Sequence, residues 1–136
     1  MANDPKSAFL QLLGLARRAG RAELGEDGVG AALAAGKGRV VFLAADAAEN
    51  SARRAAHFNE GHHAVIMRAP CSKEELGSAC GRASCAMLAV TESGLAAAAA
   101  EKLAQLDPER YGADAALLAE KNARIRTRRG KKRARN

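Results

Sequence analysis

The chain has 136 residues, of which 48% are hydrophobic, and this is enough for one compact domain with a core but not for two. Alanine accounts for 34 residues and only four are aromatic, so we expect a thin core of Leu, Val and small side chains in which bulky aromatic stacking is largely absent. No apolar run approaches the roughly 20 residues that span a bilayer, and the N-terminus lacks the pattern of a signal peptide. These features predict a cytoplasmic protein.

The net charge of +7 is concentrated near the C-terminal end. Residues 121–136 contain nine Lys and Arg and no acidic residue, whereas residues 1–120 contain 13 basic and 15 acidic residues. A basic arm on a nearly neutral body is typical of proteins that bind a polyanion, most often nucleic acid, through phosphate contacts. The alternative interpretation is a tail that only increases solubility.

The first predicted element is a helix that starts at Asp4-Pro5, an N-cap residue followed by proline at the first helical position. Its apolar residues recur at helical spacing, at Phe9, Leu12, Leu13 and Ala16. A second, shorter helix is predicted from Gly25 to the turn at residues 36–38. One face of this helix is apolar, at Val29, Ala32 and Leu33.

Three continuous apolar runs, at residues 40–44, 64–67 and 86–90, have the pattern of strands buried on both faces. A helical stretch at 50–58 separates the first two runs. Between the last two, Ser72 and Glu75 have the spacing of a helix capping box. Because strands alternate with helices that cross back over the sheet, we predict an α/β fold, a three-layer αβα sandwich with a mixed central sheet.

A helix from Glu92 to Leu106 is predicted to complete the domain, because Pro108 prevents its continuation. The residues expected on its inner side are Leu95, Ala99, Leu103 and Leu106. We therefore assign residues 1–106 to one domain and residues 107–136 to a basic extension. Within the extension a helix is expected from 113 to about 126, and the last ten residues are expected to be disordered until they bind.

The residue patterns indicate no enzyme, cofactor or metal centre. Zinc-ligand spacing is missing among His57, His62, His63, Cys71, Cys80 and Cys85. The cysteines are interpreted as reduced, small apolar fillers, and His62-His63 as a polar loop. Residues 25–30 match neither nucleotide-binding glycine motif. The helix start at Gly25 offers backbone N–H groups to a phosphate, but Glu26 and Asp27 repel that charge.

Six stretches of the sequence, taken in chain order, carry a resemblance to a known family. They are Leu13-Gly14-Leu15-Ala16-Arg17-Arg18-Ala19-Gly20, Leu24-Gly25-Glu26, Ala32-Leu33-Ala34-Ala35-Gly36-Lys37, Leu43-Ala44-Ala45-Asp46-Ala47-Ala48-Glu49-Asn50, Ser72-Lys73-Glu74-Glu75-Leu76-Gly77 and Cys80-Gly81-Arg82. Together they cover about residues 7–106 without large gaps. The sequence resembles the bacterial YlxQ-type branch of the L7Ae/L30e ribosomal protein family.

This resemblance implies an αβα sandwich that binds kink-turn RNA, a sharply bent helix with sheared G·A pairs beside a bulge. In the family, a loop and helix start with the pattern G-x-N-E-x-x-K reaches the G·A pairs. The resemblance therefore implies RNA contacts at Gly25, Glu26 and Asp27. Aligned on Gly25, the sequence has Asp27, Gly28 and Ala31 at the Asn, Glu and Lys positions. Asp27 can accept a hydrogen bond from a guanine amino group but cannot donate one, and Ala31 removes a cation.

In the family, a second contact comes from a small apolar loop before the last strand, which packs on the bulge bases. The corresponding residues here are Arg82, Ala83, Ser84, Cys85 and Ala86. Arg82 would bind a phosphate or stack on a base, whereas the alternative is a plain tight turn. Lys37 and Arg39 are expected RNA backbone contacts, with solvated loop cations as the alternative. Asp46 resembles the acid that ends the family's second strand, and we assign it a structural capping role.

The basic extension is expected to add affinity by neutralising phosphates. Its residues in this role are Arg124, Arg126, Arg128, Arg129, Lys131, Lys132, Arg133 and Arg135. We conclude that the sequence predicts a non-enzymatic, ribosomal-protein-like RNA-binding protein without cofactor, metal, membrane or small-molecule substrate. Its expected partner is kink-turn or other structured, ribosomal RNA, in the context of the ribosome or its assembly. The alternatives are a protein-interaction, scaffold or homodimer module with an eroded RNA site, and an accessory domain of a methyltransferase in a partner chain.

Overall fold

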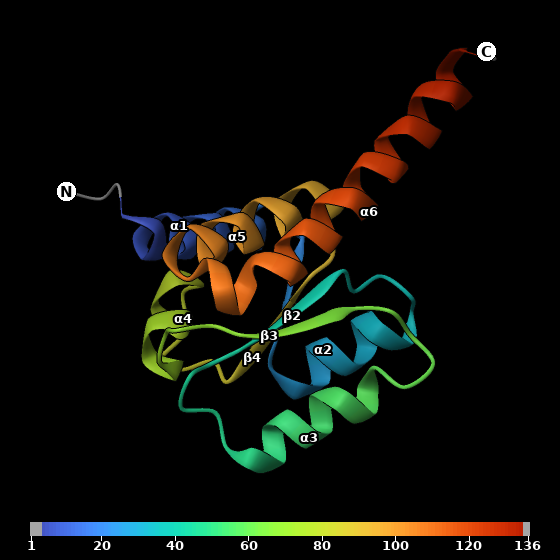
Figure 1. The fold of residues 1–136 in the computed structure, drawn as a ribbon. Coiled ribbons are helices and arrows are strands. Elements are labelled where there is room, and N and C mark those ends of the chain that lie inside the picture. Colours follow the sequence, from blue (N-terminus) through green and yellow to red (C-terminus); the bar gives the residue numbers. More distant parts are fainter. Residues whose placement is uncertain (1–3, 135–136) are drawn as a thin grey trace.

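The computed structural model describes residues 4–134, and the side chains of residues 4–131. Helices and strands alternate along most of the chain (Figure 1). They are α1 (Pro5–Arg18), β1 (Ala22–Leu24), α2 (Gly25–Ala34), β2 (Val40–Leu43), α3 (Glu49–Phe58), β3 (Val65–Arg68), α4 (Lys73–Ala79), β4 (Met87–Val90), α5 (Ser93–Leu106) and α6 (Pro108–Ala134). The predicted helices and strands up to residue 106 are confirmed to within two residues, and β1 is the one element of this region that the sequence patterns did not predict.

The four strands form one mixed sheet in the order β1-β4-β2-β3. Strands β2 and β3 are parallel, whereas β4 runs antiparallel to both β1 and β2. Val40 at the start of β2 therefore lies opposite Val90 at the end of β4. The sheet has two distinct ends: β2 begins at one, while α2 starts and β4 begins at the other.

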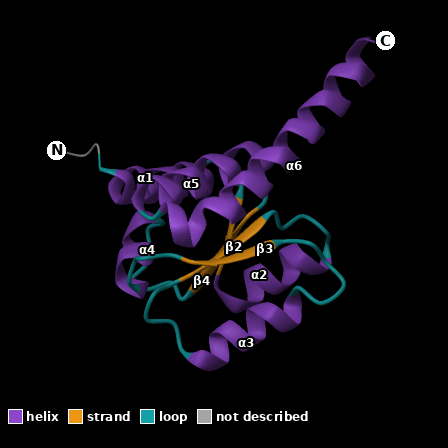
Figure 2. Cartoon of the chain, viewed as in Figure 1, coloured by secondary structure: helices purple, strands orange, loops and turns teal. Residues whose placement is uncertain are grey.

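Both faces of the sheet are covered by helices, which confirms the three-layer αβα sandwich (Figure 2). Val40 and Phe42 in β2 pack into the core beneath α1, α5 and α6, whereas Val41 and Leu43 pack against α2 and α3. All four side chains are buried, because successive residues of a strand point to opposite faces. This arrangement explains why the strand sequences are continuously apolar.

One aromatic pair lies in the core. The rings of Phe9 in α1 and Phe42 in β2 meet edge to face, with centroids 4.9 Å apart and planes at 86°. Both residues are fully buried. The pair is edge to face, so it is compatible with the expectation that bulky aromatic stacking is largely absent. A low aromatic content limits the number of such pairs but does not prevent two rings from meeting across α1 and the sheet.

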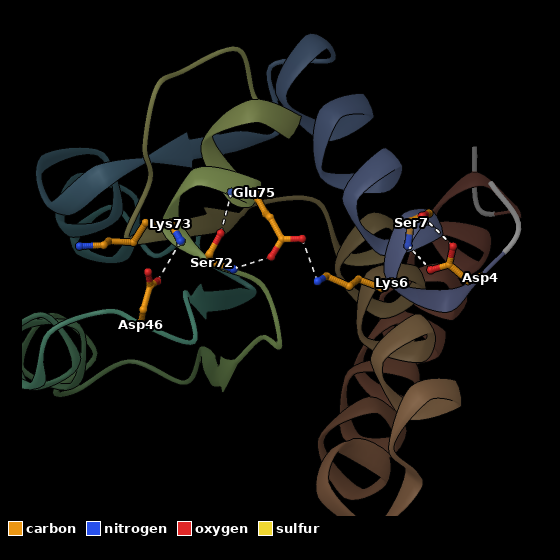
Figure 3. A network of polar contacts seen from close by, with 7 residues as sticks. All are labelled: Asp4, Lys6, Ser7, Asp46, Ser72, Lys73 and Glu75. Atoms are coloured by element: carbon orange, nitrogen blue, oxygen red, sulfur yellow. Dashed lines mark hydrogen bonds and ion pairs between the residues drawn. The ribbon is translucent and has the colours of Figure 1, made fainter. Parts of the chain in front are cut away.

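Polar contacts fix α4 against the rest of the domain (Figure 3). The capping box is confirmed, because Ser72 accepts a hydrogen bond from the Glu75 N–H and the Glu75 carboxylate accepts one from the Ser72 N–H. Glu75 also pairs with Lys6 of α1 at 2.8 Å. Asp46, after β2, accepts a hydrogen bond from the Lys73 N–H at 2.9 Å. This contact confirms the capping role that we assigned to Asp46.

The C-terminal extension differs from the expectation in two respects. The structure has one helix from Pro108 to Ala134, where we expected a shorter helix followed by disorder. Tyr111, Ala115 and Leu118 of α6 are buried in the same core as the sheet, whereas Leu106, expected to face inward, is 44% exposed. Buried residues at a spacing of three to four anchor the first half of α6. Its Arg, Lys and Ala residues then favour continuation of the helix as it projects from the body (Figure 1).

Within residues 4–134, the structure contains no helix that combines the length and the apolar character needed to span a membrane.

Candidate functional site

The start of α2 lies at one end of the sheet because β1 directly precedes it. The short strand pairs with β4, with Leu24 opposite Leu88, and Gly25 follows with a φ of 77°. A positive φ is strained for residues that carry a Cβ, so glycine suits this abrupt change from strand to helix. Gly25, Glu26 and Asp27 are thus presented together at the helix start, as the sequence predicted.

The loop before β4 reaches the same end of the sheet. The Arg82 N–H donates to the Gly77 carbonyl at 2.8 Å, and the Cys85 N–H donates to the Lys73 carbonyl at 2.9 Å. At Gly77 a Cβ would lie 2.7 Å from the Ser84 backbone, so only glycine permits this close approach. Of the predicted loop residues, Arg82, Ala83 and Ser84 are exposed, whereas Cys85 is buried and Ala86 is half-buried.

The helix start and the loop together form a surface hollow, which we call the Gly25 hollow, with a volume of about 540 Å³. Its lining consists of Arg17, Ala22, Glu23, Leu24, Gly25, Glu26, Asp27, Gly28 and Arg82. A Cβ built on Gly25 would lie 3.9 Å from an Arg82 guanidinium nitrogen. The structure thus brings together four of the predicted site residues, namely Gly25, Glu26, Asp27 and Arg82. It adds Arg17 and Glu23, which the sequence analysis did not assign to a site.

The Gly25 hollow has a mixed electrostatic character. Two arginines and three carboxylates line it. Glu26 forms an ion pair with Arg54 of α3, with 2.7 Å between its Oε2 and the arginine Nε. The Arg54 guanidinium also lies 5.5 Å from the centre of the Phe58 ring. Arg54 therefore holds the Glu26 carboxylate in place. The sequence analysis did not assign Arg54 to the site, because no local pattern links it to Glu26.

The three positions that depart from the family pattern lie on the surface or near it. Asp27 and Ala31 are exposed, and Gly28 packs beside β1, where a Cβ would lie 3.4 Å from Glu23. Asp27 therefore presents an acceptor to the hollow. Ala31 lies one helical turn further along α2 and leaves open space for a longer side chain.

Lys37 and Arg39 lie away from the Gly25 hollow, although we expected them in the same structured site. Both follow the end of α2, and Arg39 directly precedes β2, where its N–H donates to the Val90 carbonyl at 2.9 Å. The start of β2 and the start of β4 are at opposite ends of the sheet because the two strands are antiparallel. The structure therefore separates these two cations from Arg82.

The predicted basic residues of the extension lie along the outer half of α6. The exposed side chains that the structure describes are those of Arg124, Arg126, Arg128, Arg129 and Lys131. The backbones of Lys132 and Arg133 continue the helix, but their side chains lie outside the described residues, as does all of Arg135. Arg124 makes a long contact of 3.6 Å with Glu120, one turn earlier.

The three cysteines are buried free thiols. Burial raises the pKa of Cys71 to about 11, and burial also raises the pKa of Cys80 and of Cys85. A raised pKa keeps a thiol protonated and therefore poorly nucleophilic. Among residues 4–131, no group of three His, Cys, Asp or Glu side chains is arranged to hold a metal ion.

The fold and its surface define a small αβα domain with a polar hollow at one end of its sheet and a cationic helix that leaves from the other. The chain belongs to the ribosomal protein L7Ae/L30e/S12e/Gadd45 family, whose sequence profile matches residues 7–100. It is thus a ribosomal-protein-like chain, as the motifs quoted above predicted. A search of curated proteins finds no match.

Two solved structures share the fold. A protein of unknown function from Bacillus halodurans C is 24% identical, with a TM-score of 0.64, over 76% of this chain and 98% of that protein. The 15.5kD RNA-binding protein of Giardia lamblia is 22% identical, with a TM-score of 0.53, over 79% of this chain and 92% of that protein. Both similarities concern the fold, and α6 extends beyond the family match.

Proposed function

We propose that this protein binds structured RNA without catalysing a reaction, and that the Gly25 hollow reads a kink-turn or a related bend in ribosomal RNA. The observation that carries the proposal is the meeting of Gly25, Glu26 and Asp27 with the Arg82 loop in one hollow. These are the two segments that the family pattern uses for RNA. Family membership and the RNA-binding protein of the same fold support the proposal.

The chemistry of the hollow suits bases more than phosphates. Carboxylates accept hydrogen bonds from the amino groups of guanine and cytosine, and a guanidinium stacks on an unpaired base. Phosphates would be repelled by the three carboxylates, although Arg17 and Arg82 reduce this repulsion. The proposed role of the hollow is therefore to recognise RNA shape and base edges, while phosphate contacts lie elsewhere.

The test is a titration of the full-length protein against a kink-turn RNA and against a control in which Watson–Crick pairs replace the G·A pairs. We expect a preference for the kink-turn of at least about tenfold, or roughly 1.4 kcal/mol.

Arg82→Gln should reduce this preference, whereas Arg53→Gln, an equal charge change at an exposed site on α3, should preserve it. Ala31→Lys restores the cation of the family pattern and should strengthen binding to the kink-turn.

A protein-interaction module of the same fold is the second candidate. It is favoured by the departures at Asp27, Gly28 and Ala31, which weaken the RNA pattern. Absence of any kink-turn preference, together with retention of a specific protein partner, would overturn the RNA proposal in favour of this module. The bacterial YlxQ-type branch, the ribosomal context and a cytoplasmic location remain parts of the proposal.

A further inference from the structure

We infer that a cavity beside α6, at the opposite end of the sheet from the Gly25 hollow, is a second RNA site that holds the phosphate backbone. This inference deepens the proposed function, because it assumes that RNA is the partner. It differs from the expectation of a basic tail acting alone, since the cavity is built jointly by the folded domain and α6.

The cavity has a volume of about 410 Å³, and we call it the α6 cavity. Its lining comes from the loop that carries Arg39, from the loop at residues 61–63 and from α6. The apolar residues of the lining are Leu33, Leu118 and Ile125. A concave site that combines apolar residues with a few polar groups is the usual form of a ligand-binding site.

The charged side chains that line the α6 cavity are all cationic, although Glu120, beside the lining, contacts Arg124 at 3.6 Å. Four cations line it, namely Arg39, Lys121, Arg124 and Arg128, and its lining among the described residues contains no carboxylate. The Gly25 hollow, by contrast, has two cations and three carboxylates. Because the potentials of like charges around one concave surface add, the α6 end should attract phosphate more strongly than the Gly25 end.

The position of α6 over this cavity is fixed by specific contacts. Lys121 Nζ donates to the His63 carbonyl at 2.9 Å, and the buried Ser93 hydroxyl contacts the Asn122 side-chain oxygen at 2.9 Å. Leu118 is buried one turn earlier. These contacts join α6 to the loop after α3 and to the start of α5. The cations of α6 are therefore held opposite Arg39 without further ordering of this part of the chain, which lowers the entropic cost of binding.

The arrangement of the cations favours a linear polyanion. Lys121, Arg124 and Arg128 lie three and four residues apart, so they share one side of the helix, and Lys131 continues the same stripe. From Lys121 to Lys131 the stripe rises about 15 Å along the axis. It leads from the cavity onto the part of α6 that projects from the body (Figure 1). A single phosphate would occupy only the cavity, whereas an RNA backbone follows the whole stripe.

The experiment compares two double variants of the full chain that lose the same charge. Arg39→Gln with Arg128→Gln removes one cavity cation from the domain and one from α6. Arg53→Gln with Arg129→Gln removes one exposed cation from the domain and one from α6, neither of which lines the cavity. The probe is a short RNA duplex without bulge or G·A pairs, titrated at several salt concentrations.

We expect the cavity variant to lose affinity for the duplex by on the order of tenfold near physiological salt, and its salt slope to fall by about two. The control variant should lose clearly less. All four arginines are exposed, so both variants should keep the thermal midpoint of the wild type, which excludes misfolding as the cause. An equal loss of affinity in the two variants would show that the cations attract RNA by their total charge, wherever they lie. That result would overturn the inference.

The outcomes separate this inference from the proposed function. If the wild type binds the duplex through the cavity but shows no preference for the kink-turn RNA, only the proposed role of the Gly25 hollow fails. If it prefers the kink-turn but the two variants lose equal affinity, only the second site fails. Failure to bind either RNA would overturn both.

Discussion

Gly77 determines how closely the loop at residues 82–84 lies against α4. A Cβ at this position would meet the Ser84 backbone at 2.7 Å and the Arg82 carbonyl at 2.8 Å. Backbone atoms cannot move aside without shifting the loop that completes the Gly25 hollow. Gly77 therefore affects both stability and the proposed RNA contact, although it touches no ligand itself.

We expect Gly77→Ala to lower the free energy of unfolding by about 1–3 kcal/mol, because the extra methyl overpacks a closed contact. The matched control is Gly112→Ala in α6, where the added Cβ would point into open space beside the helix. That change should be neutral or stabilising by up to about 1 kcal/mol, since alanine is the better helix former. Urea denaturation measures both effects, and equal stability of the two variants would contradict this account of Gly77.

Cys71 illustrates a residue whose environment changes its chemistry. Burial raises the pKa of its thiol from 9.0 to about 11. In the unfolded chain the thiol ionises near pH 9, whereas in the folded protein it stays neutral. Its contribution to the free energy of unfolding is therefore fully present below pH 9 and is lost as the pH rises towards 11.

Denaturation under reducing conditions at pH 8 and at pH 10.5 tests whether the free energy of unfolding falls as the pH rises. The wild type should be less stable at the higher pH, and part of that loss should disappear in Cys71→Ala. Cys80 and Cys85 also have raised pKa values, so the variant should retain a smaller decrease. An identical pH dependence in the wild type and in Cys71→Ala would refute the assignment.

At the scale of elements, α6 combines two functions along its length. Its first half is structural, since Tyr111 is buried and its hydroxyl donates to the Arg68 carbonyl at 2.6 Å. Ala115 and Leu118 continue this buried side. Its outer half carries the exposed cations. The helix thus connects the core directly to the charged surface.

Truncation distinguishes the two halves. A chain ending at Leu106 loses two large buried side chains, each worth about 1.5–3 kcal/mol, and should unfold or be destabilised by several kcal/mol. A chain ending at Ala123 keeps Tyr111, Leu118 and the Lys121 contact with His63. It should therefore unfold cooperatively at nearly the wild-type urea concentration. Equal stability of the two truncated chains would show that the first half of α6 contributes nothing to the core.

At the scale of the whole molecule, the fold places chemically different surfaces at the two ends of one sheet. The Gly25 hollow has carboxylates and arginines, whereas the α6 cavity has cations alone among its described lining residues. Under the two proposals above, long-range attraction of RNA would arise mainly at the α6 end, and discrimination between RNA shapes would arise at the Gly25 end. Salt should therefore weaken overall affinity more than it weakens the preference for one RNA over another.

Much of the local structure follows from short patterns of residues. Buried strands such as residues 40–43 are recognisable because both faces are covered, and the capping box at Ser72 depends only on neighbouring residues. The family motifs also predicted that Gly25 and Arg82 belong to one site, and both line the Gly25 hollow. β1 escaped prediction because three residues are too few to show a period.

The way in which these parts combine depends on contacts between distant segments of the chain. Residues 127–134 are helical, although their charged composition predicts disorder. Composition alone does not reveal that the first turns of α6, which pack on the core, nucleate the helix. The separation of Arg39 from Arg82 follows from the antiparallel pairing of β2 with β4, a contact between segments about 50 residues apart. Local sequence patterns therefore predict the helices and strands. The grouping of charged residues into sites depends on pairing between distant strands, which a short stretch of sequence does not reveal.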